Sequence, residues 1–476
     1  MSKRKEIFVK DEDLNLQKDI LRQIKTNFSD ELLIKRGFNP SYYLITYGCA
    51  MNERDSETIE GMLEQAGFEP ASCQEDADLI LFNTCCVRDH AELKVYGNVG
   101  ALSKLKAAKP ELLIGVCGCM MQQEEVANHL FKNYKFVDMV FGTHSLYLFP
   151  QSLQNAIEGN RVLSVLESDG VIAENQPALR KKDYSASINI NFGCNNFCTY
   201  CVVPYVRGRE RSRHSKDIID EIKALADNGT IEVTLLGQNV NSYNNDSDED
   251  VTFYKLLQKI EKIEGIKRIR FMTSHPKDIS DDLIKVIAES EKICNHIHLP
   301  MQSGSNRILK LMNRGYTREA YLEKLYKAKE LIKDVQITSD FIVGFPTETQ
   351  EDFEQTLDII KKCEFASVFS FLYSPRKNTP AEKMPDQIPL EIKKERIYAL
   401  NELQREISIK QNDRFLNNVY EVLVEGKSAK VENMLIGKTT NSRVINFYSD
   451  KDLIGTMTKV KVVDTKQTSL IGERVN

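Results

Sequence analysis

Short apolar runs alternate with longer amphipathic stretches over most of the chain. Between Tyr42 and about residue 160 the apolar runs are YYLITYGC, ADLILFNTC, LLIGVCGC and VDMVFGT, and stretches such as SETIEGMLEQAG separate them. Strands that alternate with helices predict βαβ units around a parallel sheet. We therefore predict an N-terminal parallel α/β sheet domain over residues 39–160, in which ligands bind at the carboxyl ends of the strands.

Six further apolar runs follow, each with a helical pattern after it. They are ASININFGC, IEVTLLGQN, RIRFMTS, HIHLPMQ, QITSDFIVGFP and SVFSFLYS. Six βα units in series fit an open or partial (βα)6 barrel better than a second doubly wound sheet, although periodicity alone leaves both open. We predict this central domain over residues 184–411.

The remaining segments have different patterns. Residues 1–38 are charged and polar without turn residues, which indicates a helical or partly disordered extension. Residues 161–183 form a mixed polar linker. Residues 412–476 alternate apolar and polar positions between turns, which predicts a small antiparallel β-barrel.

Composition and charge indicate in which compartment the protein works and which partners it can bind. The net charge of −5 over 476 residues means that any contact with nucleic acid must come from local basic patches. No apolar run approaches the roughly 18 residues of a membrane span, so we expect a cytoplasmic protein without membrane contact. The chain has eleven cysteines. In a reducing compartment, clustered cysteines more often bind metal than form disulfides.

Three cysteines stand close together in the stretch GCNNFCTYCVVPYVRGRERSR, residues 193–213. Cys194, Cys198 and Cys201 have the spacing C-x3-C-x2-C directly after the first predicted barrel strand. Three thiolates can hold a 4Fe-4S cluster and leave its fourth iron without a protein ligand, as catalytic zinc keeps an open position. The alternatives are a zinc site that lacks one ligand, or unrelated core cysteines.

This motif after a first barrel strand resembles the radical S-adenosylmethionine (SAM) superfamily. The wider stretch, together with TYGCAMNERDS, NTCCVRDHA and GCMMQ, resembles the radical SAM methylthiotransferases over nearly everything from Tyr43 to Val475. The resemblance implies that the open iron of the first cluster binds SAM. It also implies a second, auxiliary 4Fe-4S cluster on Cys49, Cys85 and Cys119, and the use of two SAM molecules per turnover.

Two neighbouring cysteines complicate the auxiliary set. Cys86 is adjacent to Cys85, and two-residue alternation puts Cys117 on the same strand face as Cys119. Periodicity does not choose within the second pair, whereas the family pattern selects Cys85 and Cys119. The other cysteines outside the two sets, Cys73, Cys294 and Cys363, match no motif, and we expect buried, inert thiols.

Polar residues at other predicted strand ends are candidate SAM contacts, although a plain βα turn explains each of them as simply. By resemblance the candidates are Gly237, Gln238, Asn239, Gln302, Ser303, Gly344 and Glu348.

Basic residues suggest contact with RNA. Four arginines alternate along the segment after the first cysteine motif, where they could contact phosphate or form a solvated, salt-bridged face: Arg207, Arg209, Arg211 and Arg213. The C-terminal segment resembles the TRAM domain, a small RNA-binding β-barrel. Its candidate RNA contacts are Lys427, Lys430, Lys438 and Arg443.

Within the methylthiotransferases, several stretches look most like the MiaB-type tRNA enzymes. They are CVVPYVRGRERSR, LLGQNVNSY, RFMTSHP, NRGYTREAY and YSPRKNTPA. The resemblance implies methylthiolation of carbon 2 of N6-isopentenyladenosine at tRNA position 37, in the loop of the anticodon stem-loop. Asn52, Asp55 and Arg88 are substrate candidates from their adjacency to the auxiliary cysteines.

Alternative functions are methylthiolation of threonylcarbamoyladenosine in tRNA or of an aspartate in a ribosomal protein, and, more remotely, a non-catalytic iron-sulfur RNA-binding redox sensor. We also expect an electron donor such as flavodoxin or ferredoxin, and a monomer.

Overall fold

The computed structural model describes residues 7–86, 89–166, 169–245, 251–428 and 433–475. The chain forms two compact units, which we describe separately. The first comprises Met1–Lys181, Phe192–Asn195 and Val202–Arg213. The second comprises Lys182–Asn191, Asn196–Cys201 and His214–Asn476.

The chain begins with helices that belong to the core of the first unit. They are α1 (Asp11–Ile24), the π-helical segment η1 (Lys25–Ser29) and α2 (Asp30–Arg36). Ile20, Leu21 and Ile24 of α1 are buried in the same core as Ile59 and Leu63. Residues 11–36 are therefore an ordered helical cover of the domain that follows.

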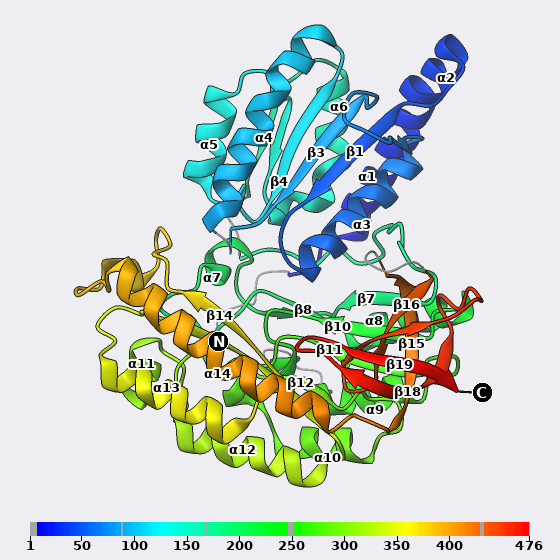
Figure 1. The fold of residues 1–476 in the computed structure, drawn as a ribbon. Helices are drawn as coiled ribbons and strands as arrows, with labels where there is room; N and C mark the ends of the chain where they lie inside the picture. The colour runs from blue at the N-terminus through cyan, green and yellow to red at the C-terminus, as the bar shows by residue number, and fades with distance from the viewer. Residues whose placement is uncertain (1–6, 87–88, 167–168, 246–250, 429–432, 476) are drawn as a thin grey trace. The chain divides into compact units, whose positions relative to one another are not determined.

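A six-stranded parallel sheet forms the centre of the first unit (Figure 1). The strands have the order β2-β1-β3-β4-β5-β6 and the bounds β1 (Ser41–Thr46), β2 (Glu69–Pro70), β3 (Leu79–Thr84), β4 (Leu113–Gly118), β5 (Met139–Phe141) and β6 (Val162–Ser164). The helical segments between them are α3 (Ala50–Gln65), α4 (Asp89–Ala108), α5 (Glu124–Asn133), η2 (Thr143–Leu148) and α6 (Phe149–Ile157). The predicted parallel α/β sheet is confirmed.

Each face of this sheet has its own apolar core. Leu79 and Leu81 of β3 pack in the core that α1, α3 and α6 cover, whereas Ile80 and Phe82 pack in the core that α4 and α5 cover. This alternation is the expected pattern for a strand buried on both faces. It leaves only the ends of the strands available for polar and reactive side chains.

Three neighbouring strands carry cysteines just after their carboxyl ends. Cys49, Cys85 and Cys119 follow β1, β3 and β4, and β3 pairs with both of the other two strands. Residues far apart in the sequence therefore meet at one edge of the sheet.

Gly118 separates the side chains of Cys117 and Cys119. Cys117 is buried in the apolar core that α3 and α6 cover, whereas Cys119 lies in a different cluster, with Cys86 and Val206. The backbone at Gly118 has φ +97°, which favours glycine and interrupts the two-residue alternation of the strand. The prediction that Cys117 and Cys119 share a strand face was therefore wrong.

The second unit contains the six predicted barrel strands, which confirms the partial barrel. They are β7 (Ser185–Asn189), β10 (Glu232–Leu236), β11 (Arg268–Phe271), β12 (His296–His298), β13 (Gln336–Val343) and β14 (Ser367–Leu372). They form two parallel three-stranded sheets, β11-β10-β7 and β12-β13-β14, and an isolated parallel bridge pairs Ile269 with Ile293.

Helices cover the outer face of these strands in a single apolar core. The helices are α8 (Ser215–Asp227), α9 (Phe253–Glu261), α10 (Asp281–Glu289), α11 (Asn306–Leu311), α12 (Arg318–Leu331), α13 (Gln350–Cys363) and α14 (Leu390–Asp413). The short connecting elements are β8 (Asn191–Phe192), α7 (Val203–Val206), β9 (Arg211–Ser212), η3 (Val240–Ser242), η4 (Pro276–Asp278) and η5 (Pro380–Lys383).

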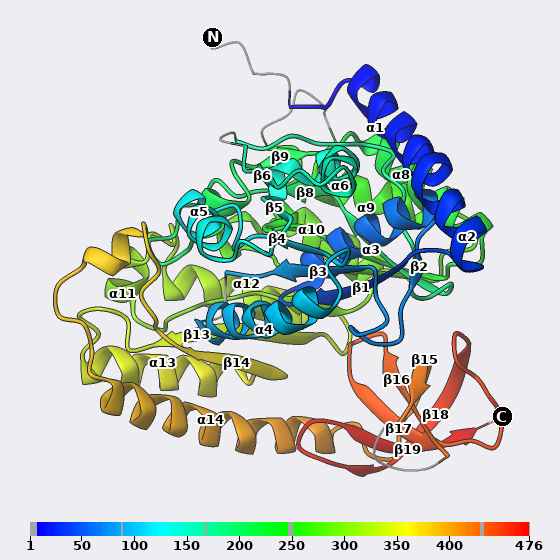
Figure 2. The ribbon, with the colours of Figure 1, turned by 90° about the horizontal axis from the view of Figure 1, so that it is seen from above.

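A closed antiparallel barrel with one parallel pair follows α14 (Figure 2). Its strands are β15 (Val419–Lys427), β16 (Met434–Thr439), β17 (Val444–Tyr448), β18 (Met457–Thr465) and β19 (Leu470–Val475), in the order β15-β16-β17-β19-β18. It has its own core, in which Val422, Phe447 and Val460 are fully buried. Across the described part of the chain, no helix has both the length and the apolar composition needed to cross a membrane.

We expect Gly118→Ala to destabilise the protein by about 3 kcal/mol, because a side chain at positive φ is strained. A Cβ atom at this position would also lie 2.4 Å from the carbonyl oxygen of Thr84. Gly97→Ala in α4 is the control, since a Cβ atom there meets nothing within 4 Å. It should stabilise the helix by about 0.5–1 kcal/mol. Urea unfolding of the two apo-proteins measures both changes, and equal stability would contradict the conformation assigned to Gly118.

Candidate functional site

Asn52 contacts two of the auxiliary cysteines in the first unit. Its side-chain oxygen, Oδ1, is 3.7 Å from Cys49 Sγ and 3.6 Å from Cys119 Sγ. Its side-chain nitrogen donates to the carbonyl oxygens of Tyr47 at 3.0 Å and Thr84 at 2.9 Å. Asn52 is thus fixed by the ends of β1 and β3 and holds an oxygen against both sulfurs.

Cys85, which follows β3, lies in the same region because it packs against Gly48 in the loop after β1. A Cβ atom on Gly48 would lie 3.1 Å from Cys85 Sγ and 3.2 Å from Asn52 Nδ2, and the backbone of Gly48 has φ +124°. Only a glycine permits this approach. Cys49 is also the residue that immediately precedes α3, so the positive end of that helix lies next to the cysteines.

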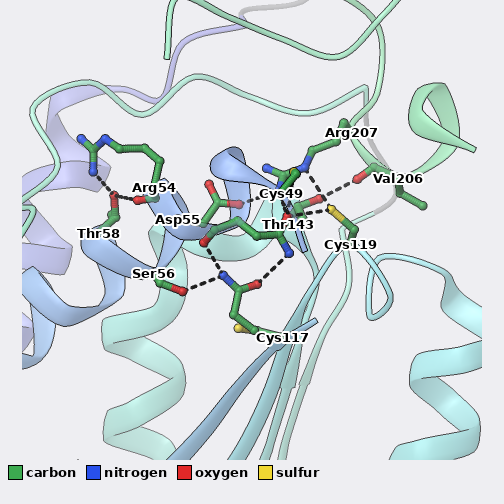
Figure 3. Close-up of polar contacts among 12 residues, drawn as sticks. Cys49, Arg54, Asp55, Ser56, Thr58, Cys117, Cys119, Thr143, Val206 and Arg207 are labelled. Atoms are coloured by element: carbon green, nitrogen blue, oxygen red, sulfur yellow. Dashed lines mark hydrogen bonds and ion pairs between the residues drawn. The ribbon is translucent and has the colours of Figure 1, made fainter. Parts of the chain in front are cut away.

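Arg207 is the cation of this site. Its Nε atom donates to Cys119 Sγ at 3.1 Å, and its Nη2 atom donates to Asn52 Oδ1 at 2.9 Å and Asp55 Oδ2 at 2.6 Å (Figure 3). Burial alone would lower the pKa of Arg207, but Asp55 and Cys119 raise it well above its ordinary value. The arginine is therefore a fixed positive charge beside the sulfur.

The charges at the site favour a thiolate at Cys119. A hydrogen bond from the thiol of Cys86 and the nearby charge of Arg207 lower the pKa of Cys119 to about 7, against the opposing effect of burial. The same contact raises the pKa of Cys86 well above its usual value. Cys86 therefore acts toward Cys119 as a protonated partner rather than as a second thiolate.

The donor set of this site fits an iron-sulfur cluster. Thiolates are the ligands of such clusters, and Cys49, Cys85 and Cys119 gather around Gly48 and Asn52 with a cation beside them. The fit is one of donor chemistry, because among the described residues no three His, Cys, Asp or Glu side chains are arranged as ligands of a single metal ion. The predicted ligand roles of the six cysteines remain predictions.

The cysteines of the C-x3-C-x2-C motif are divided between the two units. In the first unit, the backbone N–H of Cys194 donates to the carbonyl oxygen of Gly208 at 3.2 Å. In the second unit, the N–H of Cys201 donates to the carbonyl oxygen of Cys198 at 2.9 Å.

Arg314 is a residue that the sequence did not single out. Its Nη1 atom donates to Cys198 Sγ at 3.3 Å, and its Nη2 atom donates to the carbonyl oxygen of Pro300 at 2.7 Å. Burial would lower the pKa of Arg314, but the side chains of Tyr200 and Tyr316 raise it well above its ordinary value. Its position in the stretch NRGYTREAY gave no indication that it would contact a cysteine.

Several predicted SAM contacts have structural roles in the second unit. A Cβ atom on Gly237 would lie 1.8 Å from Asn191 Oδ1, so this glycine makes room for an asparagine. Asn239 donates to Asp278 at 2.7 Å and accepts the backbone N–H of His275 at 3.1 Å. Ser303 is fully buried and accepts the N–H of Ser305 at 3.2 Å. Gln238 is half-buried and remains a candidate.

Glu348 supports a turn instead of facing a ligand. Its Oε2 atom accepts the N–H of Gly344 at 2.7 Å and pairs with Arg396 Nη1 at 2.6 Å. Gly344 has φ +71°, and a Cβ atom there would lie 2.3 Å from the side chain of Lys393. We therefore no longer assign Glu348 to SAM, and Gly344 is explained by its turn.

Gln302 keeps its place as a candidate contact. Its backbone has φ +74° and pairs with β13 through Asp340 and Ile342. Its buried side-chain oxygen has no hydrogen-bond partner within the described residues. A buried polar atom without a partner is costly, so such an atom at a strand end indicates a ligand.

His275 is a second residue that the sequence analysis left out. Burial and the charges of Arg314 and Lys277 lower the pKa of His275 to about 2, so the ring is neutral. Its Nδ1 atom accepts the N–H of Lys277 at 3.2 Å, which leaves the proton on Nε2. That buried Nε2 has no partner in the part of the chain that the structure describes. A histidine directly after a barrel strand was the available signal.

The arginine arm does not have the open conformation that its alternation predicts. Arg207 is buried on Asp55, Arg211 donates to the carbonyl oxygens of Arg207 and Arg209, and Arg213 pairs with Glu174 at 2.6 Å. All three side chains have partners within the first unit, and their contact with phosphate stays a prediction. Arg209 is exposed, and for it the prediction stands.

The basic residues of the C-terminal barrel differ in the same way. Arg443 donates to Gln336 Oε1 at 2.7 Å and lies over the ring of Phe415, so it packs against the (βα)6 barrel rather than facing RNA. Lys427 is exposed, and Lys438 pairs with Glu425 at 3.4 Å. Lys430 and the substrate candidate Arg88 lie outside the described residues.

Known proteins resemble the whole chain. Residues 41–142 match the family described as "Uncharacterized protein family UPF0004", residues 188–360 match the radical SAM superfamily, and residues 413–475 match the TRAM domain. The tRNA-2-methylthio-N(6)-dimethylallyladenosine synthase of Alkaliphilus oremlandii is 51% identical over 99% of this chain and 99% of its own length. The enzyme of the same name from Caldicellulosiruptor saccharolyticus is 52% identical over 97% and 98%.

The chain belongs to the tRNA-2-methylthio-N(6)-dimethylallyladenosine synthase family. It is therefore a radical SAM methylthiotransferase of the MiaB type.

Solved structures share the fold of this synthase family member. The radical SAM methyltransferase TsrM from Kitasatospora setae, solved with cobalamin and a 4Fe-4S cluster bound, aligns with a TM-score of 0.53 at 12% identity and covers 72% of this chain and 74% of its own. The cobalamin-dependent SAM radical enzyme OxsB aligns with a TM-score of 0.50 at 13% identity, over 79% of this chain and 57% of its own.

We expect Arg396→Met in this synthase family member to lose about 3 kcal/mol of stability at pH 8, because Glu348 would be left buried without its cation. Burial already raises the pKa of Glu348, and Arg396 opposes that rise. Without the arginine the folded-state pKa rises further. The buried carboxyl of Glu348 then destabilises the fold only when it is charged, so stability falls as pH rises through the folded-state pKa of Glu348.

The loss should accordingly be smaller at pH 5 than at pH 8, as measured by urea unfolding at the two pH values. Arg405→Met is the control, since Arg405 pairs with Glu402 on the surface, where an ion pair contributes little to stability. A loss for Arg396→Met that does not depend on pH would contradict the role given to Glu348.

Proposed function

We propose that this chain attaches a methylthio group to carbon 2 of N6-isopentenyladenosine at tRNA position 37, next to the anticodon. The observation that carries the proposal is the 51% identity to a named synthase over 99% of both chains. A match of this extent spans the segments that carry both cysteine sets and the TRAM domain.

Each cysteine set would hold one 4Fe-4S cluster with three thiolates. When bound, the clusters and two SAM molecules per turnover would supply a methyl group, a transferable sulfur and a radical that removes hydrogen from an unactivated carbon. A carbon of this kind has no acidic proton, so a general base could not activate it. The protein need only bind, position and shield the reactants.

The residues of the chain divide this work. The auxiliary cluster would be bound by Cys49, Cys85 and Cys119. Beside them, Asn52 contacts the sulfur of Cys119 and accepts a hydrogen bond from Arg207. Cys194, Cys198 and Cys201 would bind the cluster that anchors SAM. The partnerless polar atoms of Gln302 and His275 are available to orient SAM at the strand ends of the (βα)6 barrel.

Recognition of tRNA would rest on the TRAM domain and on loop geometry. A base at position 37 is in a loop, so it can be presented without opening a duplex. With a net charge of −5, the chain has little general affinity for polyanions, which suits recognition by shape. We further propose that the protein acts as a cytoplasmic monomer and receives electrons from a flavodoxin or ferredoxin.

We expect Cys49→Ala to retain SAM cleavage but to attach no sulfur, because it removes a ligand of the auxiliary cluster only. Cys198→Ala should lose both activities, and Cys73→Ala should lose neither. The measurement is anaerobic reconstitution with iron counting, then incubation with SAM, reductant and an isopentenylated anticodon stem-loop, and mass analysis of the nucleosides.

The wild-type protein should hold about eight irons, two cubane clusters, and produce the methylthio mass gain. The gain should be absent with a threonylcarbamoylated stem-loop. Methylthiolation by Cys49→Ala would contradict the proposed sulfur route, and a gain only on the threonylcarbamoylated RNA would move the substrate.

Arg209→Gln and Lys427→Gln should each weaken binding of the stem-loop several-fold and reduce the dependence of log K on log salt by about 0.7, the value for one single-strand phosphate contact. Both side chains are exposed. Arg443→Gln is the contrast, because its partners are in the (βα)6 barrel. It should lower the unfolding temperature and leave the salt slope unchanged. Fluorescence titration at several salt concentrations measures the slopes, and unchanged slopes for the first two variants would refute the contacts.

A further inference from the structure

Each predicted cysteine set has one buried arginine that donates a hydrogen bond to one of its sulfurs. Arg207 Nε lies 3.1 Å from Cys119 Sγ in the first unit, and Arg314 Nη1 lies 3.3 Å from Cys198 Sγ in the second. The two arginines come from different segments and approach different elements. The same arrangement has therefore been built twice from unrelated parts of the chain.

The contacts of Arg207 show a side chain held in place from several directions. Asp55 and Asn52 accept from Nη2, which leaves Nε aimed at the sulfur. Asp55 is on the first turns of α3, directly after Cys49. The residue before the arginine, Val206, is fixed by its carbonyl oxygen, which accepts from Thr143 Oγ1 at 2.6 Å.

Arg314 is held with comparable rigidity. Its Nε atom donates to Tyr316 Oη at 3.0 Å, and its Nη2 atom donates to the carbonyl oxygen of Pro300 at 2.7 Å. Unlike Arg207, Arg314 forms no ion pair with a carboxylate of the described residues.

A structural role alone does not explain the position of Arg314. Burying a guanidinium is expensive unless negative charge lies close to it, and neutral phenols and a neutral thiol supply little. A thiolate bound to a cluster would supply that charge. N–H donors to cluster sulfurs and positive charge nearby also stabilise the more reduced, more negative state of a cluster.

We propose that Arg207 and Arg314 are paired positioning residues, each of which donates to one cysteine sulfur of its own cluster and sets the reduction potential of that cluster. The proposal rests on the proposed function, because it requires a cluster on each cysteine set. It also gives Arg207, Asn52 and Asp55 a role at the auxiliary cysteines in place of contact with RNA or substrate.

The test separates the two clusters in full-length protein. Cys194→Ala/Cys198→Ala/Cys201→Ala leaves only the auxiliary set, and Cys49→Ala/Cys85→Ala/Cys119→Ala leaves only the other. Arg207→Gln, Arg314→Gln and the surface control Arg405→Gln are each introduced into both backgrounds. The midpoint potential is measured by an anaerobic redox titration followed by electron paramagnetic resonance, together with iron content and the rate of iron loss to a chelator.

We expect a cross-over pattern. Arg207→Gln should lower the potential and speed iron loss only in the auxiliary background, and Arg314→Gln only in the other background. Arg405→Gln should change neither. Arg207→Lys, which keeps the charge but not the fork of donors, should recover part of the shift.

A second variant controls for the possibility that Arg207→Gln changes the potential only because the protein unfolds. Arg207→Gln leaves Asp55 buried without its cation, so the double variant Asp55→Asn/Arg207→Gln removes both charges together and should restore stability but not the potential. Potentials that stay unchanged while about four irons are bound would overturn the proposal and leave the proposed function intact. An auxiliary background that binds no iron would overturn the proposed function, and this inference with it.

Discussion

Parallel strands end at one edge of a sheet, and the chemistry of this protein depends on that constraint. Cys49, Cys85 and Cys119 are far apart in the sequence, yet β1, β3 and β4 are neighbours, so their ends bring the thiols to one place. The same constraint acts in the second unit, where Gln302 and His275 follow barrel strands. Everything else at the sites consists of side chains that fill in around these strand ends.

Charge at the strand ends is the second requirement. Thiolates, and any cluster bound to them, are negatively charged. In each unit the neighbouring positive charge is a buried arginine rather than an exposed lysine. Arginine suits this position because its fork of donors can satisfy a carboxylate and a sulfur at once. Because removing a guanidinium from water costs free energy, a buried arginine is stable only beside a negatively charged partner.

The fold was predictable because strand and helix patterns follow directly from local periodicity. Every predicted barrel strand is present, as are the parallel sheet and the small C-terminal barrel. The positions of single side chains were harder. Alternation put Cys117 beside Cys119, but the positive φ of Gly118 separated them. Alternation also predicted four exposed arginines. Three of them are buried, and Arg207 and Arg213 pair with Asp55 and Glu174, which lie far away in the sequence. Long-range pairing of this kind leaves no trace in local sequence.

The C-terminal barrel is attached to the (βα)6 barrel in an unusual way. Arg268, which is 2% exposed, donates to the carbonyl oxygens of Lys438 and Glu421, and Arg270 donates to that of Thr439, each at 2.8 Å. Tyr184 donates to the carbonyl oxygen of Glu425 at the same distance.

These donors contact main-chain atoms, which every amino acid presents alike. Among the side chains of the contacted residues, that of Glu421 also takes part, because its carboxylate pairs with Arg268 at 3.9 Å. During evolution, amino acids of the C-terminal barrel could therefore be replaced without loosening these main-chain hydrogen bonds.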